Sequence, residues 1–195
     1  MDRALPSGGR SRGFESLPAR LTSESGDDRL IQTLRLAIIS DTHLPRGSRV
    51  LPDECLRRLM AADAILHAGD FMELAVLEFL QGIGPPVHAV RGNVDSAELQ
   101  ARLPLTRVVH AAGARIAMVH DAGPAAGRLG RMRRRFGDAS AVVFGHSHIP
   151  LLEEEDGFAI FNPGSPTERR RSPRHTMGEA MVRDGRVSFE LIPLD

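Results

Sequence analysis

Five short segments of this chain carry side chains that are common metal ligands in proteins. Each segment offers an aspartate, an asparagine or a histidine, and no thiolate is among them. The seven candidates are Asp41, His43, Asp70, Asn93, His120, His146 and His148. Oxygen and imidazole donors suit divalent ions such as Mn, Fe, Co, Ni and Zn, with Mn as our first expectation. Two such ions a few ångströms apart can activate a water molecule to attack a phosphate ester.

The spacing within two of these segments favours ligand binding. Alternate residues of an extended segment point the same way, so Asp41 and His43 can bind one ion. In the turn 145–148, the leading glycine lets His146 and His148 point at different ions. One turn can therefore serve two metal sites.

Each segment taken alone is weak evidence for a metal site. Gly69 and Gly92 permit close backbone approach or a positive φ before Asp70 and Asn93, but such glycines also occur in plain turns. A lone histidine at a strand end is more often a hydrogen-bonded structural residue than a ligand. Four of the segments, however, follow an apolar strand, and α/β folds gather their sites at the carboxyl ends of strands. The set as a whole therefore predicts a metal centre.

A strand–loop–helix order begins at Leu34 and is expected to position these ligands. In the first helix, which starts at Pro52-Asp53, we expect Leu56, Leu59 and Met60 to share the buried side. The other apolar and periodic runs predict strands at 34–40, 64–67, 87–90 and 141–144, helices at 73–81 and 124–136, and hairpins at 107–119, 151–161 and 177–191. Early strand–helix units followed by hairpins indicate mixed sheets with helices outside.

The first 32 residues differ in composition from the rest of the chain. They are rich in Gly, Ser, Arg, Pro and acidic residues without a helix or strand period, so we expect disorder in 1–32 and one domain over 33–195. Gly13-Phe14-Glu15-Ser16 can be back-translated to the T-arm of a transfer-RNA gene, which favours a true start nearer Leu30. An ordinary flexible tail is the alternative, and mass spectrometry of the native N-terminus distinguishes the two.

Length and composition bound the class of protein. The 195 residues, 42% of them hydrophobic, suffice for one domain with its own core. The formal net charge is zero, which gives no whole-chain preference for polyanions. Cys55 is the single cysteine, so an internal disulfide is excluded and a reducing cytosol is expected. All 25 basic residues are arginine, which excludes a Schiff-base lysine. No apolar run approaches the length of a membrane span or signal peptide, so we expect no membrane association.

Taken in order, the five segments resemble the motifs of calcineurin-like metallophosphoesterases, in the small single-domain phosphodiesterase branch. The resemblance covers about 34–195, and Asn162-Pro163-Gly164-Ser165 resembles the closing turn of that branch. It implies an α/β fold (α+β four-layer) of two packed mixed β-sheets with helices on both outer faces. It also implies two ions bridged by Asp70. Asp41, His43 and His148 would complete the first site, and Asn93, His120 and His146 the second.

Charge counting supports this ligand set. Two divalent ions bring four positive charges, of which Asp41, Asp70 and a bridging hydroxide return three, so the site attracts a phosphate anion. Metal-bound water has a pKa lowered from about 15.7 to about 7, which makes the hydroxide the expected nucleophile. The ions and Asn93 would stabilise the equatorial oxygens. We expect Asp70, Asn93 and His120 to be the catalytic residues.

Two positions depart from the wider family. Many members have a histidine after the Gly-Asn pair, proposed to protonate the leaving group, and Val94 stands there instead. General-acid help of about 10²–10⁴-fold is then missing unless another group supplies it, so nitrophenyl esters should be better substrates than alkyl phosphates. Asp121 stands where glycine is common, and it can repel substrate, donate a proton or point outward.

Weaker candidates surround the motifs. Arg46 and Arg91 either contact the substrate phosphate or are solvated loop residues. Asp95 either orients a ligand through a hydrogen bond or caps the following helix. The basic residues in 131–135 and 169–171 either attract nucleic acid or a nucleotide or form a solvated face.

We therefore expect a cytoplasmic, metal-dependent phosphodiesterase that acts on a small phosphate ester. A phosphomonoesterase or nucleotidase on the same site is one alternative. The other is a non-catalytic protein-interaction scaffold, a role for which a eukaryotic trafficking-coat subunit uses this fold. The presence of all seven ligand types disfavours the scaffold. Nucleic acid as a partner, a homo-oligomer and the natural substrate stay open.

Overall fold

The computed structural model describes residues 20–22 and 31–194. Its strands are β1 (Arg20–Thr22), β2 (Ile31–Ile39), β3 (Ala64–His67), β4 (Val87–Ala89), β5 (Thr106–Ala111), β6 (Ala114–Val119), β7 (Ala141–Val143), β8 (Leu151–Glu155), β9 (Phe158–Asn162), β10 (Thr176–Arg183) and β11 (Arg186–Pro193). The helices of these residues are α1 (Asp53–Ala61), α2 (Leu74–Gly82), α3 (Ala97–Arg102) and α4 (Arg128–Arg135).

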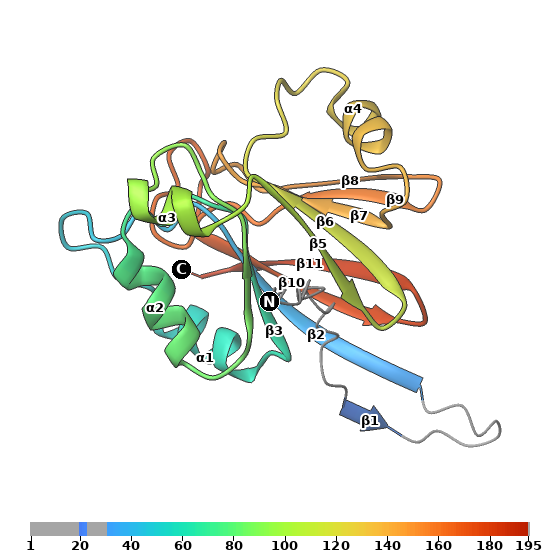
Figure 1. Ribbon diagram of the computed structural model, residues 1–195, viewed down its shortest axis with the longest axis horizontal. Helices are drawn as coiled ribbons and strands as arrows, with labels where there is room; N and C mark the ends of the chain where they lie inside the picture. The colour runs from blue at the N-terminus through green and yellow to red at the C-terminus, as the bar shows by residue number, and fades with distance from the viewer. Residues whose placement is uncertain (1–19, 23–30, 195) are drawn as a thin grey trace, which may run out of the picture.

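The strands form two mixed sheets (Figure 1). The first has the order β11-β10-β2-β3-β4, with β1 paired to β2, and the second has the order β5-β6-β7-β9-β8. Within the first sheet, β2, β3 and β4 are parallel. Within the second, β6, β7 and β9 are parallel. Each sheet therefore has one edge at which three strands end together.

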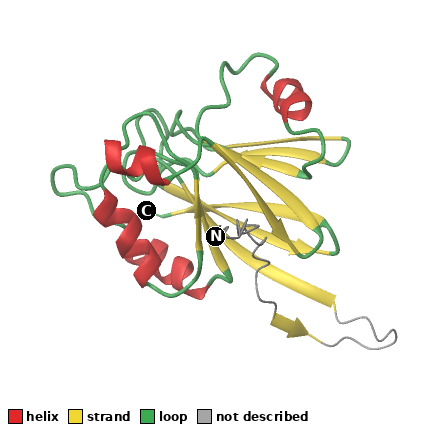
Figure 2. Cartoon of the chain, in the orientation of Figure 1, coloured by secondary structure: helices red, strands yellow, loops and turns green. Residues whose placement is uncertain are grey.

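Three apolar clusters hold four layers together. The cluster between the sheets joins Leu36 and Ile38 of β2 to Val143 of β7 and Phe161 of β9. A second cluster packs α1, α2 and α3 against the first sheet, and a third packs α4 against the second sheet. Figure 2 shows the helices on the two outer sides of the paired sheets. This confirms the expected fold of two packed mixed sheets with helices on both outer faces.

Two local expectations for the helices are wrong. Met60 is 53% exposed, and the buried positions of α1 are Cys55 and Leu59, one helical turn apart, with Leu56 half-buried beside them. Helix α4 begins at Arg128 and not at 124. Gly127, immediately before it, has a left-handed φ of 65°, which the right-handed helix cannot include.

The N-terminal segment is described only in part. Strand β1 and the first residues of β2 lie within 1–32, where we expected no regular structure. The rest of that segment up to residue 30, including 13–16, lies outside the described residues. Among the helices that the structure describes, none is long and apolar enough to cross a membrane.

Candidate metal centre

The candidate ligands follow the strands that end together in each sheet. Asp41, Asp70 and Asn93 come after the parallel strands β2, β3 and β4. His120 comes directly after β6, and the turn 145–148 follows β7, which is parallel to β6. The seven side chains predicted from the sequence consequently meet at one end of the paired sheets.

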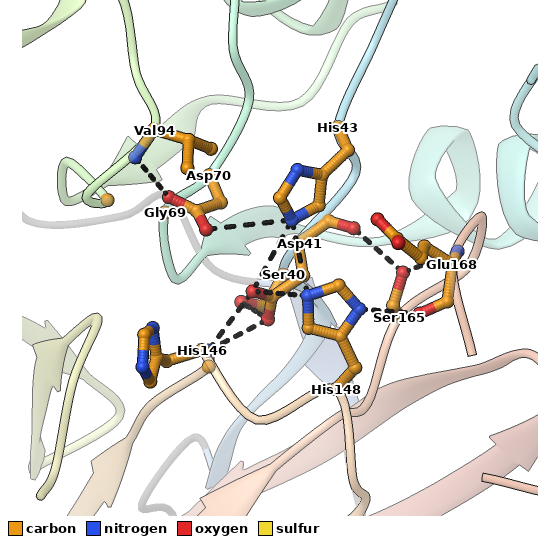
Figure 3. A network of polar contacts seen from close by, with 12 residues as sticks. Ser40, Asp41, His43, Gly69, Asp70, Val94, His146, His148, Ser165 and Glu168 are labelled. Carbon is orange, nitrogen blue, oxygen red and sulfur yellow. Dashed lines mark hydrogen bonds and ion pairs between the residues drawn. The ribbon is translucent and has the colours of Figure 1, made fainter. Parts of the chain in front are cut away.

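A buried cluster consists of Asp41, His43 and His148. Their exposed fractions are 0%, 2% and 0%. The Nε2 atom of His148 lies 3.3 Å from Asp41 Oδ1 and 3.2 Å from the Nε2 atom of His43 (Figure 3). These three residues offer ligand atoms close enough to hold one ion.

The tautomer of His148 tests whether this buried cluster fits a metal. Its Nδ1 lies 2.5 Å from the backbone carbonyl of Glu168, to which only an N–H can donate. In the neutral ring, the Nε2 atom then carries the lone pair and points it at a carboxylate oxygen of Asp41. A cation satisfies both acceptors, and a carbonyl behind the ring is a common support for a metal-binding histidine. The buried cluster therefore fits a divalent ion.

A more open cluster consists of Asp70, Asn93, His120 and His146. Asn93 Oδ1 lies 3.1 Å from His120 Nε2 and 2.9 Å from His146 Nδ1. The Nδ1 atom of His120 donates to the Ala68 carbonyl at 2.8 Å, so this ring too is anchored by a backbone oxygen. Asn93 and His146 are exposed, unlike the members of the buried cluster.

Asp70 lies between the two clusters. Its Oδ1 accepts the Val94 N–H at 3.0 Å, which fixes the carboxylate. Its Oδ2 lies 3.5 Å from His43 Nε2 and 3.3 Å from His120 Nε2. One oxygen atom is thus within reach of both clusters.

The charge states of the metal-free site follow from this arrangement. Burial raises the pKa of Asp70, but the hydrogen bond and charge of His120 and the Val94 N–H outweigh it and lower the pKa to about 2. Burial lowers the pKa of His120, but the Asp70 hydrogen bond and the charges of Asp41 and Asp70 raise it above its ordinary value. Burial, offset only in part by Asp70, lowers the pKa of His43. Below the raised pKa of His120, a metal ion in the open cluster must therefore compete with a proton on that ring.

The backbone is strained where the ligands stand. Left-handed φ values are uncommon for residues other than glycine and cluster at functional sites. Five candidate ligands adopt them: Asp41 (56°), His43 (44°), Asp70 (61°), His146 (69°) and His148 (58°). The turns are shaped to aim these side chains.

Glycines make room for the clusters. Gly69 has a φ of 95°, as expected for a position before a ligand turn. A Cβ at Gly92 would lie 2.0 Å from Asp70 Oδ1, and one at Gly145 would lie 1.9 Å from Ser40 Oγ. Close backbone approach therefore requires glycine at both positions.

The loop after β9 braces the buried cluster. Ser165 Oγ donates to the Asp41 carbonyl at 2.7 Å, and Thr167 Oγ1 donates to the Thr42 carbonyl at 2.6 Å. Asn162 Nδ2 donates to the Gly145 carbonyl at 2.8 Å. The sequence identified the turn 162–165 but gave no signal for Thr167 or Glu168, because the Thr167 hydroxyl bonds to a backbone carbonyl and Glu168 contributes its own backbone carbonyl.

Asp95 ties two ligand loops together. Its carboxylate accepts the N–H of Gly92 at 2.7 Å and the N–H of Met72 at 2.9 Å. Helix α3 is capped instead by Ser96, whose hydroxyl accepts the Leu99 N–H at 3.4 Å. Asp95 thus orients the Asn93 loop, and its capping role is not realised.

A cavity of about 310 Å³ opens beside the open cluster. It is lined by Arg91, Gly92, Asn93, Leu105, Val119, His120, Asp121, Arg135 and His146. Arg46 is exposed and is not among these residues. Asp121 lies at the cavity and accepts the Gly123 N–H at 2.7 Å. Leu105 was not predicted, and Arg135 was predicted only as one of the basic residues in 131–135, because only the tertiary packing brings these two residues to this place.

A family model for the calcineurin-like phosphoesterase superfamily domain matches residues 34–185. The chain belongs to this superfamily. As a calcineurin-like phosphoesterase it is a metal-binding hydrolase of phosphate esters, and the resemblance noted in the sequence is confirmed.

Relatives and solved structures agree with the family. A probable metallophosphoesterase of Methanothermobacter thermautotrophicus is 30% identical over 150 residues, which cover 75% of this chain and 83% of the relative. A Thermotoga maritima protein solved by NMR is 29% identical with a TM-score of 0.65, covering 83% of this chain and 99% of that one. Vacuolar Protein Sorting 29 of Cryptosporidium parvum is 23% identical with a TM-score of 0.66, covering 82% and 97%. The last likeness shows the fold alone.

Proposed function

We propose that this calcineurin-like phosphoesterase is a phosphodiesterase that works with two divalent ions. The observation that carries the proposal is Asp70, whose Oδ2 lies within 3.5 Å of a histidine of each cluster. A carboxylate oxygen in this position can be shared by two ions. Asp41, His43 and His148 would hold one of them, and Asn93, His120 and His146 the other.

Two bound ions would supply Lewis acidity and lower the pKa of a water molecule to near neutrality. The chain's own residues position the ester. Asn93 turns its Oδ1 to His120 and His146, so its amide nitrogen is the end that can donate to a phosphate oxygen. Gly92 keeps this loop close to Asp70 because it has no side chain.

The surroundings of the open cluster support a diester as substrate. Val94 is 43% exposed beside Asn93 and has no proton to give to a poor leaving group. This weighs against efficient hydrolysis of alkyl monoesters. The cavity next to His146 offers space for the second ester group of a diester. The oxygen and imidazole donor set favours Mn as the working ion, and the single cysteine favours the cytoplasm.

A protein-interaction scaffold is the second candidate. The likeness of fold to Vacuolar Protein Sorting 29 allows it. So does an open groove of about 940 Å³, on which Leu152 and Met181 are 50% and 43% exposed. A scaffold, however, has no need of the anchored imidazoles described above.

Hydrolysis of bis-p-nitrophenyl phosphate and p-nitrophenyl phosphate by metal-stripped protein tests the proposal, with Mn, Ni, Co, Zn, Fe or Mg added back. Diester cleavage should return with Mn. Asp70→Asn should abolish it, with a loss beyond the roughly 10–100-fold typical of removing a supporting group. Asp156→Asn is the matched control, because Asp156 is an exposed aspartate whose φ of 48° is also left-handed.

Two results would contradict the proposal. Faster cleavage of the monoester than of the diester would favour the phosphomonoesterase. No turnover with any ion, although two ions bind, would favour the scaffold.

A further inference from the structure

Helix α4 presents five arginines, and two of them differ from the others in their polar contacts. Arg128 donates to the Gly123 carbonyl and lies 5.0 Å from the Phe144 ring centre. Arg131 donates to carbonyls of the loop before the helix, and Arg133 pairs with Asp156. Within the described part of the chain, Arg134 and Arg135 have no ion pair with a carboxylate. They are therefore available to a ligand.

Of these two, Arg135 lines the cavity beside the metal centre and Arg134 does not. Arg135 is exposed, and its guanidinium lies 5.0 Å from the ring centre of the adjacent Phe136. Arg91 enters the same cavity from the loop after β4, with one nitrogen held by the Gln100 carbonyl at 2.9 Å. Two arginines from distant segments thus line one cavity together with His120.

Asp121 is the acidic residue of this cavity lining, and it does not cancel the two arginines. One of its oxygens accepts the Gly123 N–H at 2.7 Å. Two guanidinium groups against one carboxylate leave a positive charge, even before any metal ion is counted. Leu105 and Val119 give the cavity an apolar wall. Its volume of about 310 Å³ is at the low end for small-molecule sites, which suits part of a small substrate.

We propose that this cavity binds a second anionic group of the substrate, with Arg135 as the residue that selects it and Arg91 assisting. The substrate class is a phosphodiester that carries a further phosphate a short organic spacer away, as in a nucleoside bisphosphate ester. This inference rests on the proposed function, because it takes the metal centre as the place of the scissile phosphate. Arginine suits the role because its planar fork matches the oxygens of a phosphate.

Equilibrium binding tests this inference without requiring turnover. The probes are thymidine 3′,5′-bisphosphate and thymidine 5′-monophosphate, titrated into Mn-loaded protein by calorimetry. The bisphosphate should bind about tenfold more tightly, as one charge-assisted contact in a partly exposed site predicts. Arg135→Gln should bring the ratio of the two affinities close to one, and Arg135→Lys should retain part of it.

Arg134→Gln is the matched control, since it removes the same charge from the neighbouring exposed position of the helix, which does not line this cavity. It should keep the ratio. A ratio near one in the unmodified protein, binding of neither nucleotide, an unchanged ratio in Arg135→Gln, or an equal loss in Arg134→Gln would each overturn the inference. Failure of the proposed function is read separately, from the absence of metal-restored cleavage of bis-p-nitrophenyl phosphate.

Discussion

The two donor clusters differ in their access to solvent although they share Asp70. In the buried cluster, Asp41 and His148 have no exposed surface, and the loop after β9 covers them. In the open cluster, Asn93 and His146 are exposed beside a cavity. On the proposed function, the buried cluster would retain an ion and the open cluster would meet the substrate.

The largest effect that this comparison predicts concerns the leaving group. If substrate meets the open cluster, Val94 offers no proton where many family members have a histidine, and rates should fall steeply as the leaving group becomes more basic. Val94→His should raise the rate on alkyl diesters, by up to the roughly 10²–10⁴-fold typical of general acids. Rates on a series of aryl and alkyl diesters give the dependence. Val108→His, at a valine 38% exposed on β5, is the control. A flat dependence on leaving-group pKa would contradict the account.

Removing one histidine from each cluster sharpens the comparison further. His148→Ala should leave no ion on the protein after dialysis, because the buried site has lost an anchored ligand. His146→Ala should keep one ion, because only the exchangeable site is damaged. Inductively coupled plasma mass spectrometry of the dialysed proteins measures both. His110→Ala, on β5 and outside both clusters, should behave as the unmodified protein. Equal loss of bound ions from His148→Ala and His146→Ala would contradict the distinction between the buried and the open cluster.

Acidification should separate the clusters by their proton affinity. The pKa of His120 is raised above its ordinary value, so the open cluster must release a proton to bind an ion, and its affinity should fall up to about tenfold per pH unit below that pKa. The pKa of His43 is lowered, so His43 stays neutral further into acid. Calorimetric titration of Mn at pH 8, 7 and 6 should therefore show that Mn binding by the open cluster is lost before Mn binding by the buried cluster. Parallel loss of both sites would be inconsistent with these shifts.

The smallest predicted effect concerns the turn 145–148, which contributes one histidine to each cluster. Buried Asn162 donates to the Gly145 carbonyl and to Ser147 Oγ, and it accepts the Gly164 N–H. Asn162→Ala should lower the free energy of unfolding by about 1–3 kcal/mol, because buried backbone groups lose their partner. Urea denaturation measures this. Ser147→Ala removes only one of these contacts, so it should lower the free energy of unfolding by less. A larger loss of stability in Ser147→Ala than in Asn162→Ala would show that the Asn162 amide does not brace the turn.

Much of the site could be predicted because its ligands follow strands that are evident in the sequence. Apolar runs before Asp41, Asp70 and Asn93 mark strand ends, and parallel strands bring their carboxyl ends to one edge. Met60 was misplaced because an apolar residue near a buried stripe can still point to solvent. The start of α4 was missed because the conformation of Gly127 is not visible in a periodic pattern.

The sequence could not single out Arg135 among the basic residues in 131–135 for the role proposed above. Its neighbours 131–134 are also largely arginine, and residue type does not separate a ligand-facing arginine from one that holds a loop. Only the packing of α4 against the second sheet does so. Thr167 and Glu168 were missed for a related reason, since they support Asp41, Thr42 and His148 through contacts with backbone atoms.

Anomalous diffraction from a crystal soaked in Mn tests the central claim most directly. The account predicts two peaks on either side of Asp70 Oδ2, one among Asp41, His43 and His148 and the other among Asn93, His120 and His146. The second peak should weaken first as the Mn concentration is lowered. A single peak at saturating Mn, or peaks that do not share Asp70, would contradict the account.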